Sequence, residues 1–410
     1  MGKSTKPVIA PKKGKLRSVQ KRPALRKSQK WITVPYTRDK SAVSPRGQRK
    51  DQIKWKRTLP ELLAASDRDI VRMLIADKLL PDWSGRQCPR CCQGTLSKLM
   101  PDKRSGALKH RCSAKKCHVW MNPHHLHPLF TEGQGPEAKS LQHQAALLLL
   151  KLHRIQQSTT HMLMDANHKS LEDLERKLCK LRQNFVEKKE REILLGSGTA
   201  WQDVEADEAT FDKKNISKSL EFKHLIKSKD STTMWEQWAG IVQRGRPESL
   251  ILRRLTPKIT VKRAPGPGAI RKVEWRNMAT ELLKDRKVIL HTDSAKSYKL
   301  RVPGVIHDRV VHCKKRVKVN GKMQWKAPHY VKVVKHTLPT KNGKKPKTVY
   351  VKAGTQVIDR CWRFLKSRVQ LNQHTKAGSQ LLRAKLRAAQ YEYWYRNADL
   401  WVKTGELCSW

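Results

Sequence analysis

Acidic residues and long hydrophobic runs are both scarce in this sequence. Asp and Glu total 35 against 88 Lys and Arg, which gives a formal net charge of +53 over 410 residues. Self-repulsion on that scale opposes folding unless a polyanion compensates it, so we expect nucleic acid as the partner. The longest apolar run, Ala145–Leu150, is far shorter than the roughly 20 residues that span a bilayer. The N-terminus also lacks the apolar core of a secretion signal, so we expect neither membrane insertion nor export.

Composition divides the chain into five predicted segments. Residues 1–58 contain 19 Lys or Arg and two Asp with few apolar residues, which predicts a disordered basic tail. A helix and a cysteine-rich unit are predicted over 59–130, and a helical region over 131–197. A mixed α/β domain is predicted over 198–372, followed by a basic and aromatic helical extension over 373–410. Localisation would be nuclear in a eukaryote, and otherwise in the cytoplasm or nucleoid.

Helical periodicity dominates the first half of the chain. "SDRDIVRMLIADKLL" predicts a helix with Ser66 as its N-cap. "SLQHQAALLLLKLHRI" and "SLEDLERKLCKLRQNF" predict two more helices, the second opened by a Ser170/Asp173 capping box. The stretch between them, "QQSTTHMLMDANHK", predicts a short helix and a turn. These helices form either a DNA-binding helix-turn-helix or a small bundle.

From Trp201 the pattern changes to short strand-like runs, with one helix, "RNMATELLKDR", before the last of them. The runs are "WQDVEADEATF", "WAGIVQRG", "SLILRRL", "KITVKRA" and "KVILHTD". A basic stretch then predicts a hairpin that turns at Asn342-Gly343. Two helices, "VIDRCWRFLKSRVQ" and "QLLRAKLRAAQYEYWYRNADLW", complete the chain. Its aromatic cluster "YEYWYRN" favours docking on the core over stacking on bases.

The cysteine spacing predicts a structural zinc site. The motif Cys88-x2-Cys91 is followed about 20 residues later by Cys112-x4-Cys117, which brings four thiolates to the corners of a tetrahedron. Cys92 and His118 lie next to these ligands and leave alternatives open, with His118 as the substitute for Cys117. Paired thiols of this kind indicate a reducing compartment.

Acidic residues recur where strand-like runs end. Asp207 and Glu208 follow an alternating run, Asp293 follows the apolar run "VIL", and Asp359 lies on a predicted helix with Lys366 seven residues later. Three carboxylates from distant segments are what two Mg²⁺ or Mn²⁺ ions require for phosphodiester chemistry. On its own stretch, Asp293 is equally well explained as a turn or cap residue.

The order of these motifs resembles the ISXO-two-like insertion-sequence DDE transposases, which have an RNase H-like catalytic fold. The resemblance runs from about residue 66 to 368. It includes a helix before "CPRC", "V-x-A-D-E-x-x-F" at residues 204–211, "T-D-x-x-x-S-Y" at 292–298 and "H-x-x-V-x-H" at His307 and His312. It ends with "TQVIDRCWRFLK", where the family pattern is T-N-x-I-E-x-x-W-x-x-L-K.

The resemblance implies an RNase H-like mixed sheet flanked by helices over 198–372, preceded by a zinc ribbon. It implies Asp207 and Asp293 as metal ligands, with Lys366 near DNA phosphate. Gln356 replaces the family's Asn and Asp359 its Glu, so each side chain keeps its functional group but changes its reach. Glu208 is favoured as a supporting group, and His307 and His312 either position the metal and DNA or pack structurally.

Two functions follow from these patterns. The first is a transposase that cuts and joins DNA strands at element ends and target with Mg²⁺ or Mn²⁺, and carries structural Zn²⁺. The second is a catalytically weakened, transposase-derived zinc-ribbon protein that only binds DNA. Assembly of several copies on DNA is left open by the sequence.

Overall fold

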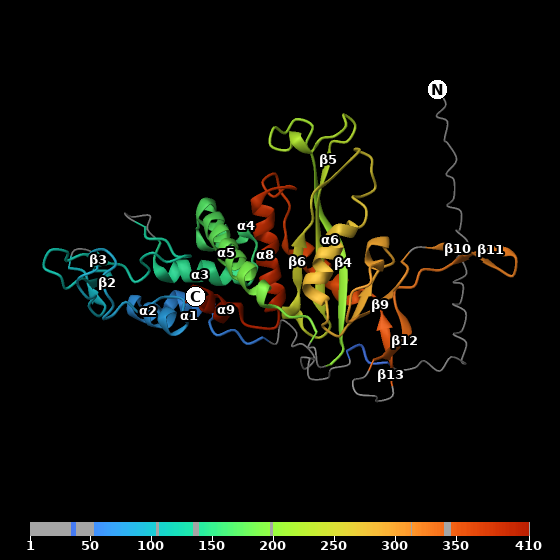
Figure 1. The fold of residues 1–410 in the computed structure, drawn as a ribbon. Helices are drawn as coiled ribbons and strands as arrows, with labels where there is room; N and C mark the ends of the chain where they lie inside the picture. The colour runs from blue at the N-terminus through green and yellow to red at the C-terminus, as the bar shows by residue number, and fades with distance from the viewer. Residues whose placement is uncertain are drawn as a thin grey trace, which may run out of the picture. The chain divides into compact units, whose positions relative to one another are not determined.

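The computed structural model describes residues 34–37, 53–103, 106–133, 139–196, 200–312, 314–339 and 346–409 (Figure 1). Residues Pro35–Trp410 form one compact unit. Most of the predicted basic tail, and the predicted turn at Asn342-Gly343, lie outside the described residues. Within the described part of the chain, no helix is long and apolar enough to cross a membrane.

Helices from both halves of the sequence share one apolar core. They are α1 (Leu59–Ala64), α2 (Asp67–Ala76), α3 (Leu141–Leu152), α4 (Gln157–Met164), α5 (His168–Lys189) and α9 (Leu400–Cys408). Trp401 of α9 is fully buried there, and its indole Nε1 donates a hydrogen bond of 2.8 Å to the carboxylate of Asp77. The C-terminal helix is therefore anchored to the end of α2.

The first residues of α2 and α5 show which of the predicted N-caps are correct. Ser66 caps α2 as predicted, because its side chain accepts a hydrogen bond from the backbone N–H of Asp69. The Ser170/Asp173 capping box is wrong, since α5 begins at His168. The side chain of Asn167 accepts from the N–H of Lys169 at 2.8 Å, so the helix starts one turn earlier than predicted.

The cysteine-rich segment forms a small antiparallel sheet. Its strands are β1 (Met100–Pro101), β2 (Leu108–Arg111) and β3 (Trp120–Met121), in the order β1-β2-β3. Isolated bridges join Gln87 to Thr95 and Leu96 to Cys112. Cys88, Leu96, Cys112 and Met121 form its buried centre.

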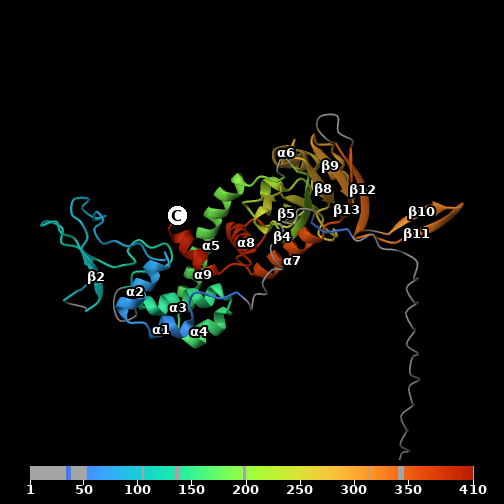
Figure 2. The ribbon, with the colours of Figure 1, turned by 90° about the horizontal axis from the view of Figure 1, so that it is seen from below.

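A larger mixed sheet has the strand order β6-β5-β4-β8-β9, with β7 also paired to β5 (Figure 2). β4 pairs antiparallel with β5, which pairs antiparallel with β6 and β7, whereas β8 is parallel to both β4 and β9. The bounds are β4 (Gln202–Asn215), β5 (Thr233–Gln243), β6 (Ile251–Arg254), β7 (Lys258–Thr260), β8 (Val288–Thr292) and β9 (Val305–Arg309). The five strands predicted from "WQDVEADEATF" to "KVILHTD" are confirmed as β4 to β8.

Helices cover both faces of this sheet, and the alternation along β4 decides which residue meets which helix. Val204 and Ala206 pack against α6 (Lys272–Leu283). Ala209 and Phe211 pack on the opposite face against α7 (Gln356–Arg368) and α8 (Gln380–Trp394). Figure 2 shows α6 and α7 on opposite sides of the sheet. Successive strand side chains alternate, so Asp207 belongs to the α7 face and Glu208 to the α6 face.

Two basic hairpins lie between β9 and α7. β10 (Lys315–Val319) and β11 (Lys322–Lys326) are joined by Asn320 and Gly321, both with positive φ, and this hairpin was not predicted. β12 (Lys332–Leu338) pairs with β13 (Lys347–Ala353), as expected of the predicted basic hairpin. Short 3-10 turns occur at η2 (Glu190–Glu192), η3 (Lys223–Leu225), η4 (Pro247–Ser249) and η5 (Lys296–Lys299).

The aromatic cluster of the C-terminal extension is part of the core. Tyr391, Tyr393 and Trp394 of α8 are buried against the α7 face of the sheet. The predicted docking of "YEYWYRN" on the core is therefore confirmed.

A buried chain of ionisable side chains connects β4, β8, β9 and β12. The fully buried His291 contacts Asp203 through Nε2 at 2.9 Å and Asp308 through Nδ1 at 2.8 Å. Asp308 also contacts His336 at 2.9 Å. Burial alone would lower the pKa of His291, but the hydrogen bonds to the two carboxylates outweigh it and raise this pKa. Both ring nitrogens of His291 thus donate, and the imidazolium joins three strands.

This arrangement predicts that His291 keeps its proton in the folded protein to higher pH than in the unfolded chain. The resulting stabilisation is fully present below the unfolded-state pKa of about 6.5 and is lost as pH rises through the raised folded-state pKa. NMR of the histidine ring nitrogens against pH, in buffer and in urea, measures both states. Deprotonation of His291 at the same pH in both would contradict the assignment.

Candidate functional site

Four cysteine sulfurs converge in the small sheet. The Sγ atoms of Cys88, Cys91, Cys112 and Cys117 all lie within 4.8 Å of one another, and those of Cys91 and Cys112 are 3.6 Å apart. They come from two loops, and Cys88 and Cys112 are buried. A cluster of this donor type and spacing can hold zinc in a closed tetrahedral site, which makes it structural.

The backbone conformation of each loop explains why Cys92 and His118 lie outside the cluster of four sulfurs. Cys92 and His118 each follow the second cysteine of a pair, and both have positive φ, 52° and 44°. Both side chains are exposed and lie outside the cluster. Gly94 permits close packing, because a Cβ there would lie 2.6 Å from Sγ of Cys112. Cys91 and Cys117, rather than Cys92 and His118, are therefore the second sulfur donors of the two pairs.

The protonation of these thiols fits a divalent cation. The backbone N–H groups of Gly94 and Gln93 lower the pKa of Cys91 to about 6. The N–H of Ala114 acts in the same direction on Cys112, but burial and the neighbouring sulfurs raise that pKa to about 12. Four thiolates at this distance repel one another, so full ionisation needs a bound cation between them.

Asp207 lies in the middle of β4 on the face covered by α7. Its Oδ2 accepts a hydrogen bond of 3.1 Å from the indole Nε1 of Trp362. Gly240 on β5 makes room for that ring, because a Cβ there would lie 2.6 Å from Trp362. Burial raises the pKa of Asp207 well above its usual value, and the charges of Glu208, Asp359 and Asp293 raise it further. Asp207 is thus electrostatically coupled to both other predicted ligands.

Asp359 and Asp293 come from two different elements next to β4. Asp359 lies in the first turn of α7, where burial raises its pKa and a 3.2 Å hydrogen bond from Thr355 partly offsets that rise. Asp293 directly follows β8, and its Oδ1 accepts from the N–H of Ala295 at 2.8 Å. That bond is the turn role considered for Asp293, and it leaves the other carboxylate oxygen available.

The three carboxylates are spread more widely than the cysteine sulfurs. Among the described residues, only the four cysteines form a group whose ligand atoms all lie within 4.8 Å. Asp207, Asp293 and Asp359 therefore do not form a comparably close group of ligand atoms. None of the three aspartates forms an ion pair with another described residue.

Glu205 is one of two residues at this site that sequence reasoning missed. Its buried carboxylate accepts from the N–H groups of Val357 at 2.7 Å and Ile358 at 3.0 Å, which caps α7. It also pairs with Arg244 at 2.7 Å, and Arg244 in turn donates to the carbonyl oxygens of Lys352 and Gly354. Glu205 thus fixes the start of α7, and with it Asp359, relative to β4.

A short N-terminal segment reaches the same helix start. The hydroxyl of Tyr36 lies 2.9 Å from Oε1 of Glu205 and 2.9 Å from Oε1 of Gln356. Its ring lies over the guanidinium of Arg244 at 4.4 Å. Burial, followed by the charge of Glu205, raises the pKa of Tyr36. The composition of residues 1–58 gave no sign that their single tyrosine contacts the site.

Other predicted residues lie around the acids in different roles. The Gln356 amide donates to the carbonyl oxygen of Tyr330 at 2.6 Å, whereas Lys366 is exposed on α7. His307 contacts the Thr292 hydroxyl at 2.8 Å beside Asp293, and burial lowers its pKa to about 4.

The remaining two predicted neighbours lie on different sides of the sheet. The His312 ring lies 5.1 Å from that of Tyr330, whose carbonyl oxygen accepts from Gln356 at the start of α7. On the α6 face, Glu208 accepts from the Tyr298 hydroxyl and from the N–H of Ile270. The carboxylate of Glu208 is therefore used in structural hydrogen bonds on the α6 face.

No family model matches the chain, and no curated protein or solved structure matches it. Sequence motifs and geometry are therefore the basis for any assignment of function.

The cysteine cluster predicts about one tightly bound Zn²⁺ per chain in the purified protein. Cys112→Ser should abolish zinc binding and unfold the small sheet, because the ligand is buried and the fold depends on the metal. Cys92→Ser is the matched control and should keep full zinc content. Elemental analysis and circular dichroism measure the two effects.

Two results would contradict the zinc assignment. One is a metal-free native protein with the small sheet intact. The other is equal zinc loss in the Cys92→Ser and Cys112→Ser variants.

Proposed function

We propose that the chain is a DDE-type DNA transposase with an RNase H-like catalytic domain. The carrying observation is a group of three aspartates, Asp207, Asp293 and Asp359, which come from distant segments and have no ion-pair partner among the described residues. In a chain of net charge +53, cations are abundant, yet burial and then the charges of Glu208, Asp359 and Asp293 raise the pKa of Asp207. Such uncompensated carboxylates are suited to divalent cations.

The architecture supports this proposal. An antiparallel β4-β5-β6 meander is extended by β8 and β9, both parallel to β4, which is the strand arrangement of RNase H-like domains. The acids occupy the first strand, the end of the next parallel strand and the helix that follows the sheet. The motifs that resemble ISXO-two-like transposases occur at the same positions.

The electrostatics support DNA as the partner, at element ends and at the target. The β10–β11 hairpin exposes Arg316, Lys318 and Lys322, and Trp325 on it is 64% exposed. The Arg316 guanidinium lies 5.6 Å from the ring of Trp325. Basic side chains beside an exposed aromatic ring suit contacts to phosphates and bases.

The proposed reaction uses Mg²⁺ or Mn²⁺ held by the three aspartates, and bound metal would supply Lewis-acid activation of water and of the scissile phosphate. Glu205 keeps Asp359 aligned with β4, while Trp362 orients Asp207. Lys366, exposed on α7, would bind a backbone phosphate near the cut.

A catalytically weakened, DNA-binding descendant is the second candidate function. Asp359 is one methylene shorter than the family's Glu, and a misplacement of about 1 Å can slow an enzyme a hundredfold. Gln356 is also held by Tyr36 and Tyr330 rather than directed at a ligand. This candidate retains zinc and DNA binding without strand cleavage.

The proposal predicts Mg²⁺- or Mn²⁺-dependent nicking of supercoiled plasmid. Asp293→Asn should reduce nicking by about a hundredfold or more, the scale on which loss of one electrostatic stabiliser slows an enzyme. Asn can still accept the hydrogen bond from Ala295, so the turn should survive. DNA binding should be retained, because basic surfaces supply it. Asp285→Asn, at an exposed acid, is the control with the same change of charge.

Nicking by Asp293→Asn at the parental rate would contradict the transposase mechanism. A parent protein that binds DNA but never nicks it with either metal would favour the second candidate.

A further inference from the structure

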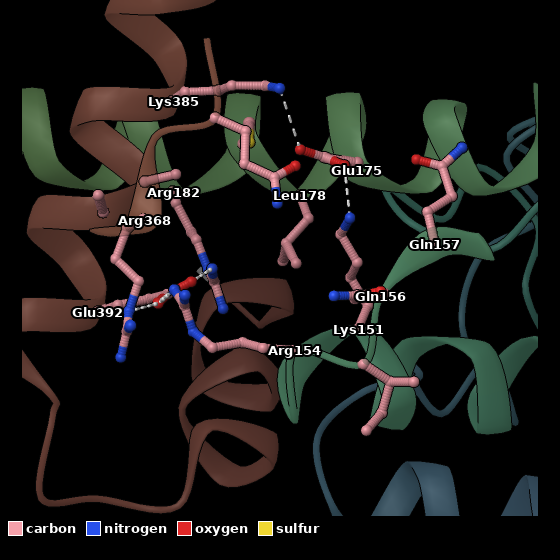
Figure 3. A pocket seen from close by; sticks show the side chains of 15 residues that line it. Lys151, Arg154, Gln156, Gln157, Glu175, Leu178, Arg182, Arg368, Lys385 and Glu392 are labelled. Carbon is pink, nitrogen blue, oxygen red and sulfur yellow. Dashed lines mark hydrogen bonds and ion pairs between the residues drawn. The ribbon is translucent and has the colours of Figure 1, made fainter. Parts of the chain in front are cut away.

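A cavity of about 160 Å³ lies between the end of α3, the middle of α5, the end of α7 and α8 (Figure 3). Its lining residues include none of the three aspartates. Arg368, one of its lining residues, lies nine residues after Asp359 on α7, which corresponds to a rise of about 14 Å along the helix axis. The cavity is therefore separate from the proposed cleavage site.

Positive charge exceeds negative charge in this cavity. Its cationic side chains are Lys151, Arg154, Arg182, Arg368 and Lys385, and its acids are Glu175 and Glu392. Figure 3 shows the three arginines gathered around Glu392, and both lysines beside Glu175. Five cations against two carboxylates leave three positive charges uncompensated among the lining residues.

The arginine trio has unused hydrogen-bonding capacity. Arg182 donates to Glu392 at 2.6 Å through Nη1, but its Nε and Nη2 have no hydrogen-bond partner among the described residues. Its side chain is only 5% exposed, so solvent does not fully replace those bonds. The Nε of Arg368 is also without a hydrogen bond and lies 3.6 Å from Glu392.

Burial lowers the pKa values of all three arginines, and repulsion between guanidiniums adds to this effect at Arg154. Burial, together with the charges of Arg368 and Arg182, lowers the pKa of Arg154 to about 9. Burial also lowers the pKa of Arg182 and of Arg368. A bound anion would reverse this effect, because it stabilises the charged form of all three side chains.

We infer that this cavity binds a phosphate monoester. Three guanidiniums against one carboxylate leave two positive charges at the arginine end, and a phosphate monoester carries about −1.5 to −2 at neutral pH. The planar guanidinium fork matches phosphate oxygens in paired hydrogen bonds, which favours phosphate over a spherical anion. The cavity also exceeds the space of one water molecule by roughly tenfold.

The phosphate could come from a nucleic-acid strand end or from a small free phosphate compound. Both present the same group to the arginines, so the experiment below has one arm for each source. Neither arm measures strand cleavage, so the result does not depend on the proposed transposase activity.

The first arm is calorimetric titration with inorganic phosphate at constant ionic strength. Arg154→Gln should weaken phosphate binding by about tenfold, the scale of one charge-assisted hydrogen bond. Arg368→Gln should do the same and covers the case in which the first variant folds poorly. Arg176→Gln is the matched control: it lies on the same helix as Arg182, is 74% exposed and removes the same charge outside the cavity.

The second arm compares one short oligonucleotide with a 5′-phosphate or a 5′-hydroxyl. Tighter binding of the phosphorylated form, lost in Arg154→Gln but kept in Arg176→Gln, identifies the ligand as a strand end. Weaker binding of inorganic phosphate in the cavity variants without this discrimination identifies a free phosphate compound. Equal phosphate affinity in Arg154→Gln, Arg368→Gln and Arg176→Gln would overturn the inference.

Discussion

The buried carboxylate of Glu205 holds the central sheet and α7 in one geometry. It caps the first turn of α7 through two backbone N–H groups and pairs with Arg244, whose other nitrogens donate to the chain just before that helix. Removal of one partner from such a buried pair typically costs about 3–5 kcal/mol. Because Asp359 lies in this turn and Asp207 two residues beyond Glu205, the same contact sets the distance between two proposed metal ligands.

A scarcity of acids gives each buried carboxylate a clear role. Glu205 pairs with Arg244 and Asp77 with Arg57, and Asp308 contacts His291 and His336, so these three interior acids have basic side chains as partners. Asp207 and Asp293, which are half-buried, and Asp359, which is exposed, differ, since no described cation forms an ion pair with them. The arginine cavity is the converse case, in which cations exceed acids. Our two proposals thus assign a divalent cation to one site and a phosphate to the other, and both ligands belong to the chemistry of nucleic acids.

Local patterns predicted those features that depend on nearby residues. The cysteine spacing identified all four sulfurs of the cluster, because each loop brings its own pair together and only the joining of two pairs is long-range. The short strand-like runs identified β4 to β8, and the local pattern of "RNMATELLKDR" identified the helix α6. Positive φ at Cys92 and His118, which removes them from the cluster, cannot be read from residue identity alone.

Features that depend on distant contacts could not be predicted. Glu205 is part of the quoted strand, but its helix lies 152 residues later, and an alternating pattern does not distinguish a helix cap from a metal ligand. Tyr36 was missed because a basic segment gives no periodicity to follow. The start of α5 was misplaced because Asn167 and Ser170 are both good caps, and only the preceding turn decides between them.

Uptake of Mn²⁺, followed by electron paramagnetic resonance of the free ion, tests the central claim most directly. A strongly basic protein repels cations, so adventitious Mn²⁺ sites should be few. The account predicts saturable uptake of about two Mn²⁺ per chain in addition to zinc, lost in Asp207→Asn while zinc is retained. No saturable uptake, or uptake unchanged by Asp207→Asn, would show that the three aspartates do not form a metal site.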